Sequence, residues 1–160
     1  MIVVISDTSP VRALHHLGRL SILSDLYSRV VIPPAVQREL SRPPTQFPSI
    51  DVSSLPFFEV CAPHDTAHVQ RLLQLLDEGE SEAIALAAEL QAVVLIDEAA
   101  GRLTAAQEGV RTLGTLGVLL EGKSIGKVQS VGPLMDRLIR ELNFFVSNDV
   151  RLDVLRLAGE

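Results

Sequence analysis

Short runs of branched apolar residues recur along the chain, and each is followed by a segment with helical spacing. Continuous apolar runs of this length suit strands that are buried on both faces of a parallel sheet. Apolar runs of this kind occupy residues 2–5, 30–32 and 93–96, and residues 56–61 and 110–113 are two further strand candidates that include polar positions. Strands that alternate with helices imply a parallel sheet with helices on both faces. The pattern therefore predicts one α/β domain over residues 1–160.

Apolar residues at helical spacing fill most of the sequence between these runs. Ser9 has the chemistry of an N-cap and Pro10 suits the first helical position, so a helix follows the first strand. The predicted helices span about residues 10–17, 21–27, 34–40, 65–76, 80–90, 98–108, 115–120, 133–142 and 147–157, with a turn at 122–126. Three prolines make 41–55 a loop that is long enough to serve as a lid or a partner-binding segment. We expect the last two helices, about residues 128–160, to form an appended flank.

Composition narrows the class of protein. A hydrophobic content of 47% with 21% charged residues argues for a folded globular chain. No apolar run approaches the roughly 20 residues that cross a bilayer, the N-terminus lacks a secretory pattern, and Cys61 is the only cysteine. These features predict a cytoplasmic protein without a membrane segment. The net charge of −6 counts against a broad basic surface for nucleic acid, but it allows an enzyme whose acidic site recruits divalent cations.

Carboxylates are predicted at the carboxyl edge of the parallel sheet, where α/β proteins bind ligands. Asp7 and Asp97 each end an apolar run, and the carboxyl ends of parallel strands meet at one edge of the sheet. Glu39 and Glu82 lie on predicted helices that can pack beside that edge. Clustered carboxylates repel one another and raise one another's pKa, and a hard divalent cation such as Mg²⁺ relieves this repulsion. The four residues are therefore candidate metal ligands.

Five blocks of sequence, spread over nearly the whole chain, form a characteristic combination. They are Asp7-Thr8-Ser9-Pro10 after its strand, Val31-Ile32-Pro33-Pro34-Ala35-Val36 leading to Glu39-Leu40, Gly79-Glu80-Ser81-Glu82-Ala83-Ile84, Leu95-Ile96-Asp97 and Gly114-Thr115-Leu116-Gly117. No single block is decisive, but their combination and order are specific. Through them the chain resembles the PIN domain family, and more closely the VapC-like relatives that are catalogued as a domain of unknown function.

The resemblance implies a three-layer α/β/α fold with a central parallel sheet of about four or five strands. It implies an Mg²⁺- or Mn²⁺-dependent ribonuclease, the toxin of a toxin–antitoxin pair, that acts on RNA, is held by a cognate antitoxin protein and forms a homodimer. The family's acidic positions fall on Asp7, Glu39, Glu82 and Asp97. VapC toxins usually carry Asp at the third position, so Glu82 is a departure, and only Glu98 is available for a further acidic residue after the fourth.

Several of these residues also have ordinary structural interpretations. Glu80 and Glu82 lie in a first helical turn, where the helix dipole favours negative charge without any catalytic role. Thr8 and Ser9 have hydroxyls for a metal-bound water or a phosphate, but capping explains Ser9 equally well. Arg102 is interpreted as a solvated side chain rather than a phosphate ligand. The four histidines have no metal-binding spacing and receive no function.

Two other functions stay open. The first is a PIN-like binding module that has lost efficient catalysis and acts through protein partners, which the Glu82 departure and the absence of basic stripes favour. The second is a phosphatase with Asp7 as its nucleophile. Phosphatase chemistry of this kind commonly has a second aspartate two residues later, and Ser9 occupies that position.

Overall fold

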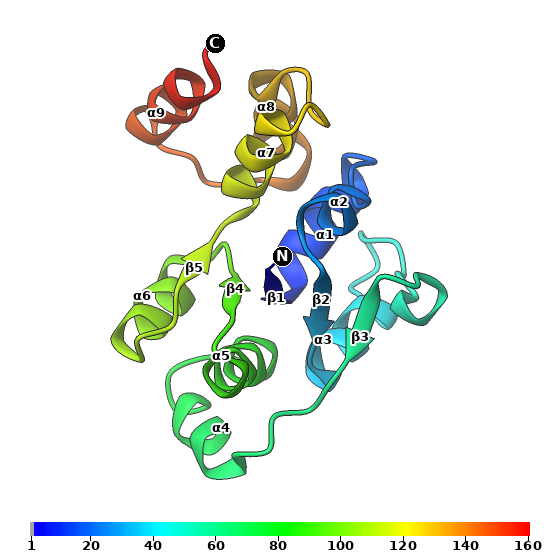
Figure 1. Ribbon diagram of the computed structural model, residues 1–160, viewed down its shortest axis with the longest axis vertical. Helices are drawn as coiled ribbons and strands as arrows, with labels where there is room; N and C mark the ends of the chain where they lie inside the picture. Colours follow the sequence, from blue (N-terminus) through cyan, green and yellow to red (C-terminus); the bar gives the residue numbers. More distant parts are fainter. Residues whose placement is uncertain (1) are drawn as a thin grey trace.

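The computed structural model describes residues 2–160 and contains a five-stranded parallel sheet with helices on both faces (Figure 1). The strands are β1 (Val3–Ser6), β2 (Arg29–Ile32), β3 (Phe58–Val60), β4 (Val93–Leu95) and β5 (Thr112–Leu113). The helices are α1 (Thr8–His16), α2 (Ile22–Leu26), α3 (Pro34–Ser41), α4 (Thr66–Leu72), α5 (Glu78–Leu90), α6 (Ala99–Gln107), α7 (Thr115–Ser124), α8 (Val131–Leu142) and α9 (Asn148–Ala158). The predicted three-layer α/β/α fold is confirmed. None of the helices within residues 2–160 combines the length and the apolar character needed to cross a membrane.

The order of the strands places the topological switch point of the sheet, where open α/β sheets form a crevice, between β1 and β4. The sheet runs β3-β2-β1-β4-β5, and in the parallel register Ile5 pairs with Val31 on one side and with Val94 on the other. The chain therefore builds outward from β1 to β3 and then returns to the other side of β1. In open α/β sheets, ligands bind outside the carboxyl ends of the strands at such a switch point. Asp7 follows β1 and Asp97 lies just beyond β4, so the two carboxylates flank this crevice.

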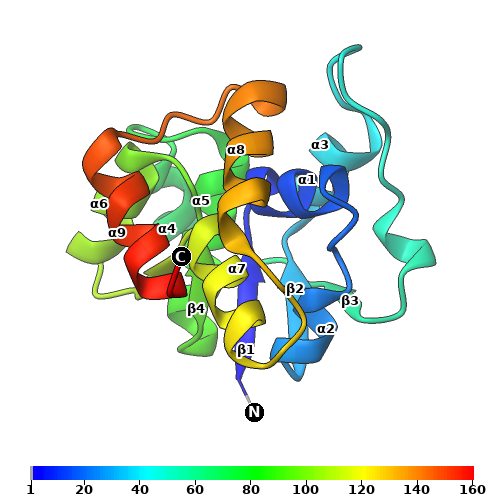
Figure 2. The same cartoon turned by 90° about the horizontal axis from the view of Figure 1, so that it is seen from above.

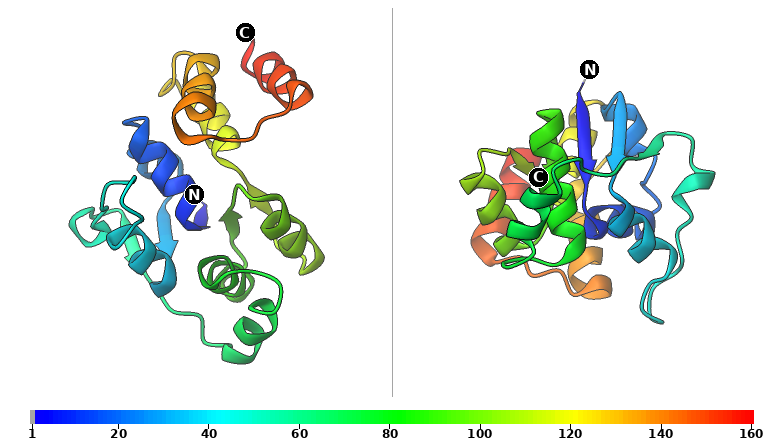
Figure 3. Two further views of the ribbon diagram at one scale, coloured as in Figure 1. Left: turned by 180° about the vertical axis from the view of Figure 1, so that it is seen from behind. Right: turned by 90° about the horizontal axis from the view of Figure 1, so that it is seen from below.

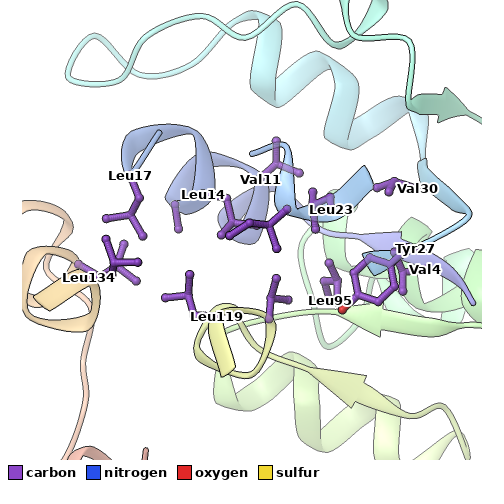
Figure 4. Close-up of a cluster of buried hydrophobic side chains, with 14 of the residues drawn as sticks. Val4, Val11, Leu14, Leu17, Leu23, Tyr27, Val30, Leu95, Leu119 and Leu134 are labelled. Atoms are coloured by element: carbon purple, nitrogen blue, oxygen red, sulfur yellow. The ribbon is translucent and has the colours of Figure 1, made fainter. Parts of the chain in front are cut away.

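Alternate strand residues divide the core into two clusters, because successive side chains of a strand point to opposite faces. On one face, Val4 and Leu95 pack with Leu14 of α1, Leu23 of α2 and Leu119 of α7 (Figure 4). On the other face, strand side chains pack against residues of α4, α5 and α6. Figure 3 shows these two layers from behind and from below. Alanines at 83, 85 and 87 let α5 lie close to the sheet.

The C-terminal helices pack on α7 rather than on the sheet. Helix α9 contacts α7 and α8, and the connection between α8 and α9 crosses the molecule near the first turn of α7 (Figures 1 and 2). In Figure 2, β1 runs from the N-terminus towards α1, so the carboxyl edge of the sheet lies on the same side as this connection and as the loop after α3.

Some predicted boundaries are wrong, and Gly122 gives the clearest reason. The predicted turn at 122–126 begins too early, because α7 continues to Ser124 and Gly122 is buried within it. A Cβ at Gly122 would lie 3.0 Å from a methyl group of Val128, so this glycine serves close packing. The backbone turns at Gly126, whose φ of 80° favours glycine. Helix α8 likewise begins at Val131, before the proline that we expected to open it.

Candidate active site

Asp7 is a buried carboxylic acid at the centre of the carboxyl edge. Its backbone N–H donates to the carbonyl oxygen of Leu95 at 3.0 Å, which extends the sheet by one residue and fixes the position of Asp7. Its side chain is only 6% exposed. Burial raises the pKa of Asp7 to about 7; a hydrogen bond from the backbone of Thr8 offsets this in part, and the charges of Asp77, Glu39 and Glu98 add to the rise.

Glu39 of α3 lies against the same glycine as Asp7. One oxygen of Glu39 accepts a 2.6 Å hydrogen bond from the hydroxyl of Thr8. A Cβ placed on Gly79 would lie 2.9 Å from the other oxygen, Glu39 Oε1, and 3.3 Å from Asp7 Oδ1. Two carboxylate oxygens therefore border one point at the first turn of α5. The structure thus brings together two of the four residues that the sequence indicated.

Glu80 is a third acidic group of this edge, and sequence analysis assigned it only a helix-dipole role. Its side chain is 3% exposed, and Oε1 has no hydrogen-bond partner among the described residues. Burial raises the pKa of Glu80 to about 8, and a shared hydrogen bond with Glu98 and the charges of Asp77, Asp7 and Glu98 raise it further. Helical spacing gave a signal for this placement, because Glu80 lies four residues before Ile84 on the buried face of α5.

Gly101 of α6 makes room for this buried acid. A Cβ at Gly101 would lie 3.5 Å from the carboxyl carbon of Glu80 and 3.3 Å from Ile96. The backbone of α6 therefore covers Glu80 closely. The burial of Glu80 therefore depends on how closely α6 approaches the first turn of α5.

Glu82 and Asp97 each accept hydrogen bonds from the first turn of another helix. Glu82 Oε1 accepts a 3.2 Å hydrogen bond from the backbone N–H of Ala35, in the first turn of α3. Asp97 accepts from the backbone N–H of Thr115 at 2.7 Å, from the Thr115 hydroxyl at 2.8 Å and from the Ser9 hydroxyl at 3.0 Å. The carboxylate of Asp97 therefore joins the starts of α1 and α7. Neither Glu82 nor Asp97 is among the charges that raise the pKa of Asp7.

A family model described as a PIN domain matches residues 3–160. The chain belongs to the PIN domain family. PIN domains are generally nucleases, so the chain has a nuclease-type fold. Among solved structures, the chain is similar to a PilT N-terminus domain protein from the hyperthermophilic archaeon Sulfolobus solfataricus P2, with 21% sequence identity and a TM-score of 0.49 over 76% of this chain and 92% of that one. No curated protein matches the chain.

The acidic groups of this PIN domain have the chemistry of a site for a hard divalent cation. Between residues 2 and 160, no three His, Cys, Asp or Glu side chains converge closely enough to form a complete metal site. Mg²⁺, however, is usually bound through only one or two carboxylates and keeps several waters. Asp7 and Glu39 supply two such carboxylates, and the unpartnered Oε1 of Glu80 leaves a third acceptor unsatisfied. The donors present therefore fit a hard divalent cation.

A positive group borders this acidic edge of the PIN domain. Arg12 lies one helical turn after Thr8 on α1, and its guanidinium donates to the backbone oxygen of Glu39 at 3.4 Å. The guanidinium also lies over the ring of Phe47, 4.5 Å from the ring centroid. Burial lowers the pKa of Arg12, although the charges of Glu39 and Asp7 act in the opposite direction. Phe47 thereby attaches the loop after α3 to the rim of the site.

The contact at Gly79 predicts the effect of one added methyl group. In Gly79→Ala, the Cβ would displace Glu39 Oε1 and press closely on Asp7 Oδ1, while alanine itself favours the helix. We expect the variant to remain folded but to lose most of the rise in unfolding temperature that Mn²⁺ gives the wild type, as differential scanning fluorimetry can measure. An unchanged response to Mn²⁺ would show that the space beside Gly79 is not the cation position.

Proposed function

We propose that this PIN domain is an endoribonuclease that hydrolyses RNA phosphodiester bonds with Mg²⁺ or Mn²⁺. The observation that carries the proposal is the pair of carboxylates, Asp7 and Glu39, that border Gly79 at the switch point of the sheet. A polyanionic substrate cannot approach these carboxylates unless their charge is neutralised. A divalent cation supplies that neutralisation.

The residues divide the work as follows. Asp7 and Glu39 would hold the cation, with Glu80 as a further acceptor. When bound, such a cation lowers the pKa of a water and stabilises charge on the phosphoryl oxygens. Thr8 orients Glu39 through its 2.6 Å hydrogen bond. Asp97 acts as a positioning residue, since it fixes the starts of α1 and α7, and Glu82 does the same at the start of α3.

The proposal includes a role as the toxin of a toxin–antitoxin pair, with a cognate antitoxin protein and a homodimer as partners. Support comes from the family and from large apolar side chains that are exposed in the isolated chain, such as Leu75, Leu152 and Leu157. Apolar side chains of this kind leave water when a partner docks on them. Growth arrest on induction of the wild type, but not of Asp7→Ala, would support the toxin role.

A cleavage assay tests the enzymatic proposal. We expect purified protein to shorten a mixed RNA substrate with Mn²⁺ or Mg²⁺, to stop on addition of EDTA, and to lose this activity in Asp7→Ala. Asp149→Ala, which removes an exposed carboxylate of α9, serves as the matched control. Activity that survives in Asp7→Ala comes from a contaminant or from another site.

The same assay distinguishes a second candidate, a PIN-like binding module without efficient catalysis. The glutamate at position 82, where the family resemblance implies an aspartate, favours this candidate. A binding module would show neither cleavage nor an increase in unfolding temperature with Mn²⁺, whereas the nuclease would show both.

A further inference from the structure

A groove of about 950 Å³ leads away from the acidic edge, between α6 and β5 on one side and the α8–α9 connection on the other. We refer to it as the α6–α9 groove. Its polar lining includes Ser9, Asp97, Glu98 and Arg102. Its apolar lining includes Leu113, Leu116, Leu120, Phe144, Phe145 and Val150. The groove therefore joins residues of the candidate active site to a mostly apolar wall.

Phe145 stands at the rim of this groove with its ring in solvent. Its side chain is 94% exposed, which is unusual for a phenylalanine. The neighbours on either side, Phe144 and Val146, pack against the core cluster that contains Leu119. The backbone N–H of Phe144 also donates to the carbonyl oxygen of Leu138 at 3.1 Å. Because both neighbours are anchored inward, the residue between them is held outward. Phe145 thus presents its aromatic ring to solvent from a backbone that the packing of its two neighbours holds in place.

Arg102 supplies the positive charge of the groove. Within residues 2–160, its guanidinium has no acidic ion-pair partner. A Cβ on Gly114 would lie 3.9 Å from a guanidinium nitrogen of Arg102 and 3.2 Å from Asp97 Oδ1, so the cation stands beside the start of α7. An unpaired arginine next to carboxylates, in a chain of net charge −6, is a candidate contact for a phosphate.

We propose that the α6–α9 groove binds a nucleotide of single-stranded RNA next to the bond that is cleaved. Arg102 contacts a backbone phosphate and Phe145 stacks on the base. The inference rests on the proposed nuclease function, because it takes the strand that leaves the acidic edge as the occupant of the groove. Bases of a duplex are already stacked on one another, so only an unpaired base can lie on Phe145.

Continuity favours a nucleotide over a peptide as the occupant. Ser9, Asp97 and Glu98 belong both to the groove and to the carboxyl edge, so a strand held at that edge enters the groove directly. A nucleotide also has the required order of groups, with a phosphate towards Arg102 and an aromatic base towards the apolar wall. A protein segment docked on Phe145 is the alternative outcome of the test.

Fluorescence anisotropy with a labelled oligouridylate of about ten nucleotides tests the inference, since this length matches single-strand sites. The measurement uses Ca²⁺ in place of Mn²⁺, with a gel to confirm that the oligonucleotide stays intact. The variants are Phe145→Ala, Phe145→Trp and Arg102→Gln. The matched controls are Leu75→Ala, which removes another exposed apolar side chain, and Arg71→Gln, which removes an exposed arginine of α4, a helix that does not line the groove.

The two positions should give different signatures. Phe145→Ala should raise the Kd about tenfold without changing its salt dependence, and Phe145→Trp should restore binding. Arg102→Gln should weaken binding and reduce the slope of log Kd against log salt by about 0.7, the value for one lost phosphate contact on a single strand. Neither control should change the Kd or the slope.

The inference is overturned if the wild type does not bind the oligonucleotide, or if both groove variants bind as it does. It is also overturned if Phe145→Ala leaves RNA affinity unchanged but abolishes self-association in sedimentation velocity, because the groove is then a protein-docking surface. The anisotropy assay in Ca²⁺ measures RNA binding without requiring cleavage. A protein that binds RNA through the groove but never cleaves it therefore contradicts the proposed nuclease and not the subsite.

Discussion

Asp7→Asn is expected to stabilise the cation-free protein, raising its free energy of unfolding at pH 8 by up to about 4 kcal/mol. The folded state raises the pKa of Asp7 from 3.8 to about 7, and a difference of roughly three pKa units corresponds to this energy at about 1.36 kcal/mol per unit. Asparagine has nearly the same shape and carries no charge to desolvate. Urea denaturation in EDTA measures the change.

The effect should depend on pH in a defined direction. The protonated form of Asp7 is favoured in the folded state, so its stabilising contribution is complete below the unfolded pKa of 3.8 and is lost as the pH rises through about 7. Wild type and Asp7→Asn should therefore have equal stability near pH 4, and the variant should be more stable at pH 8. Asp149→Asn, in the exposed first turn of α9, should show no such divergence. A wild type that equals or exceeds the variant at pH 8 would contradict the burial of an ionisable Asp7.

Mn²⁺ should reverse the order of stability and make the wild type more stable than Asp7→Asn. A cation that binds only the folded wild type stabilises it by mass action, whereas Asp7→Asn loses one of the two carboxylates that border Gly79. Asp7 then lowers the stability of the cation-free protein but is needed to bind the cation. Such a trade-off between stability and function is common for active-site groups.

Glu80→Gln is expected to lower cation-dependent RNA cleavage by roughly a hundredfold, since the contribution of a bound cation amounts to several kcal/mol. Glu82→Gln should retain activity within a few-fold, because a glutamine oxygen can still accept the hydrogen bond from Ala35. Single-turnover rates at saturating protein give the comparison, and circular dichroism confirms that both variants fold. The opposite ranking would return the third acidic position to Glu82, where the family resemblance places it.

The sequence predicted the fold well because its signals are local. Most strands contain a short apolar run, and Pro34 opens the helix after β2 as predicted. The prediction for the first helix is wrong by two residues, because α1 begins at Thr8 with Asp7 as its N-cap, and the Ser9 hydroxyl donates to Asp97 instead of capping the helix. Asp7 and Glu39 were also identified, and the structure brings them together. The environment of Glu80 was harder to predict, since it depends on how closely α6 passes over α5 at Gly101. Two glutamates separated by two positions point in different directions from a helix, and a motif alone does not distinguish them.

The helix N-termini at the carboxyl edge of the sheet contribute a positive electrostatic potential there. Helices α1, α3, α6 and α7 each begin just after the carboxyl end of a strand, and the first turn of α5 lies against Asp7 and Glu39. The N–H groups of their first turns place five positive dipole ends at one edge. This positive potential offsets part of the repulsion among the carboxylates that a chain of net charge −6 places at this edge. Relatives that lost those acids would not present a neutral crevice but a ready receptor for phosphate or another small anion.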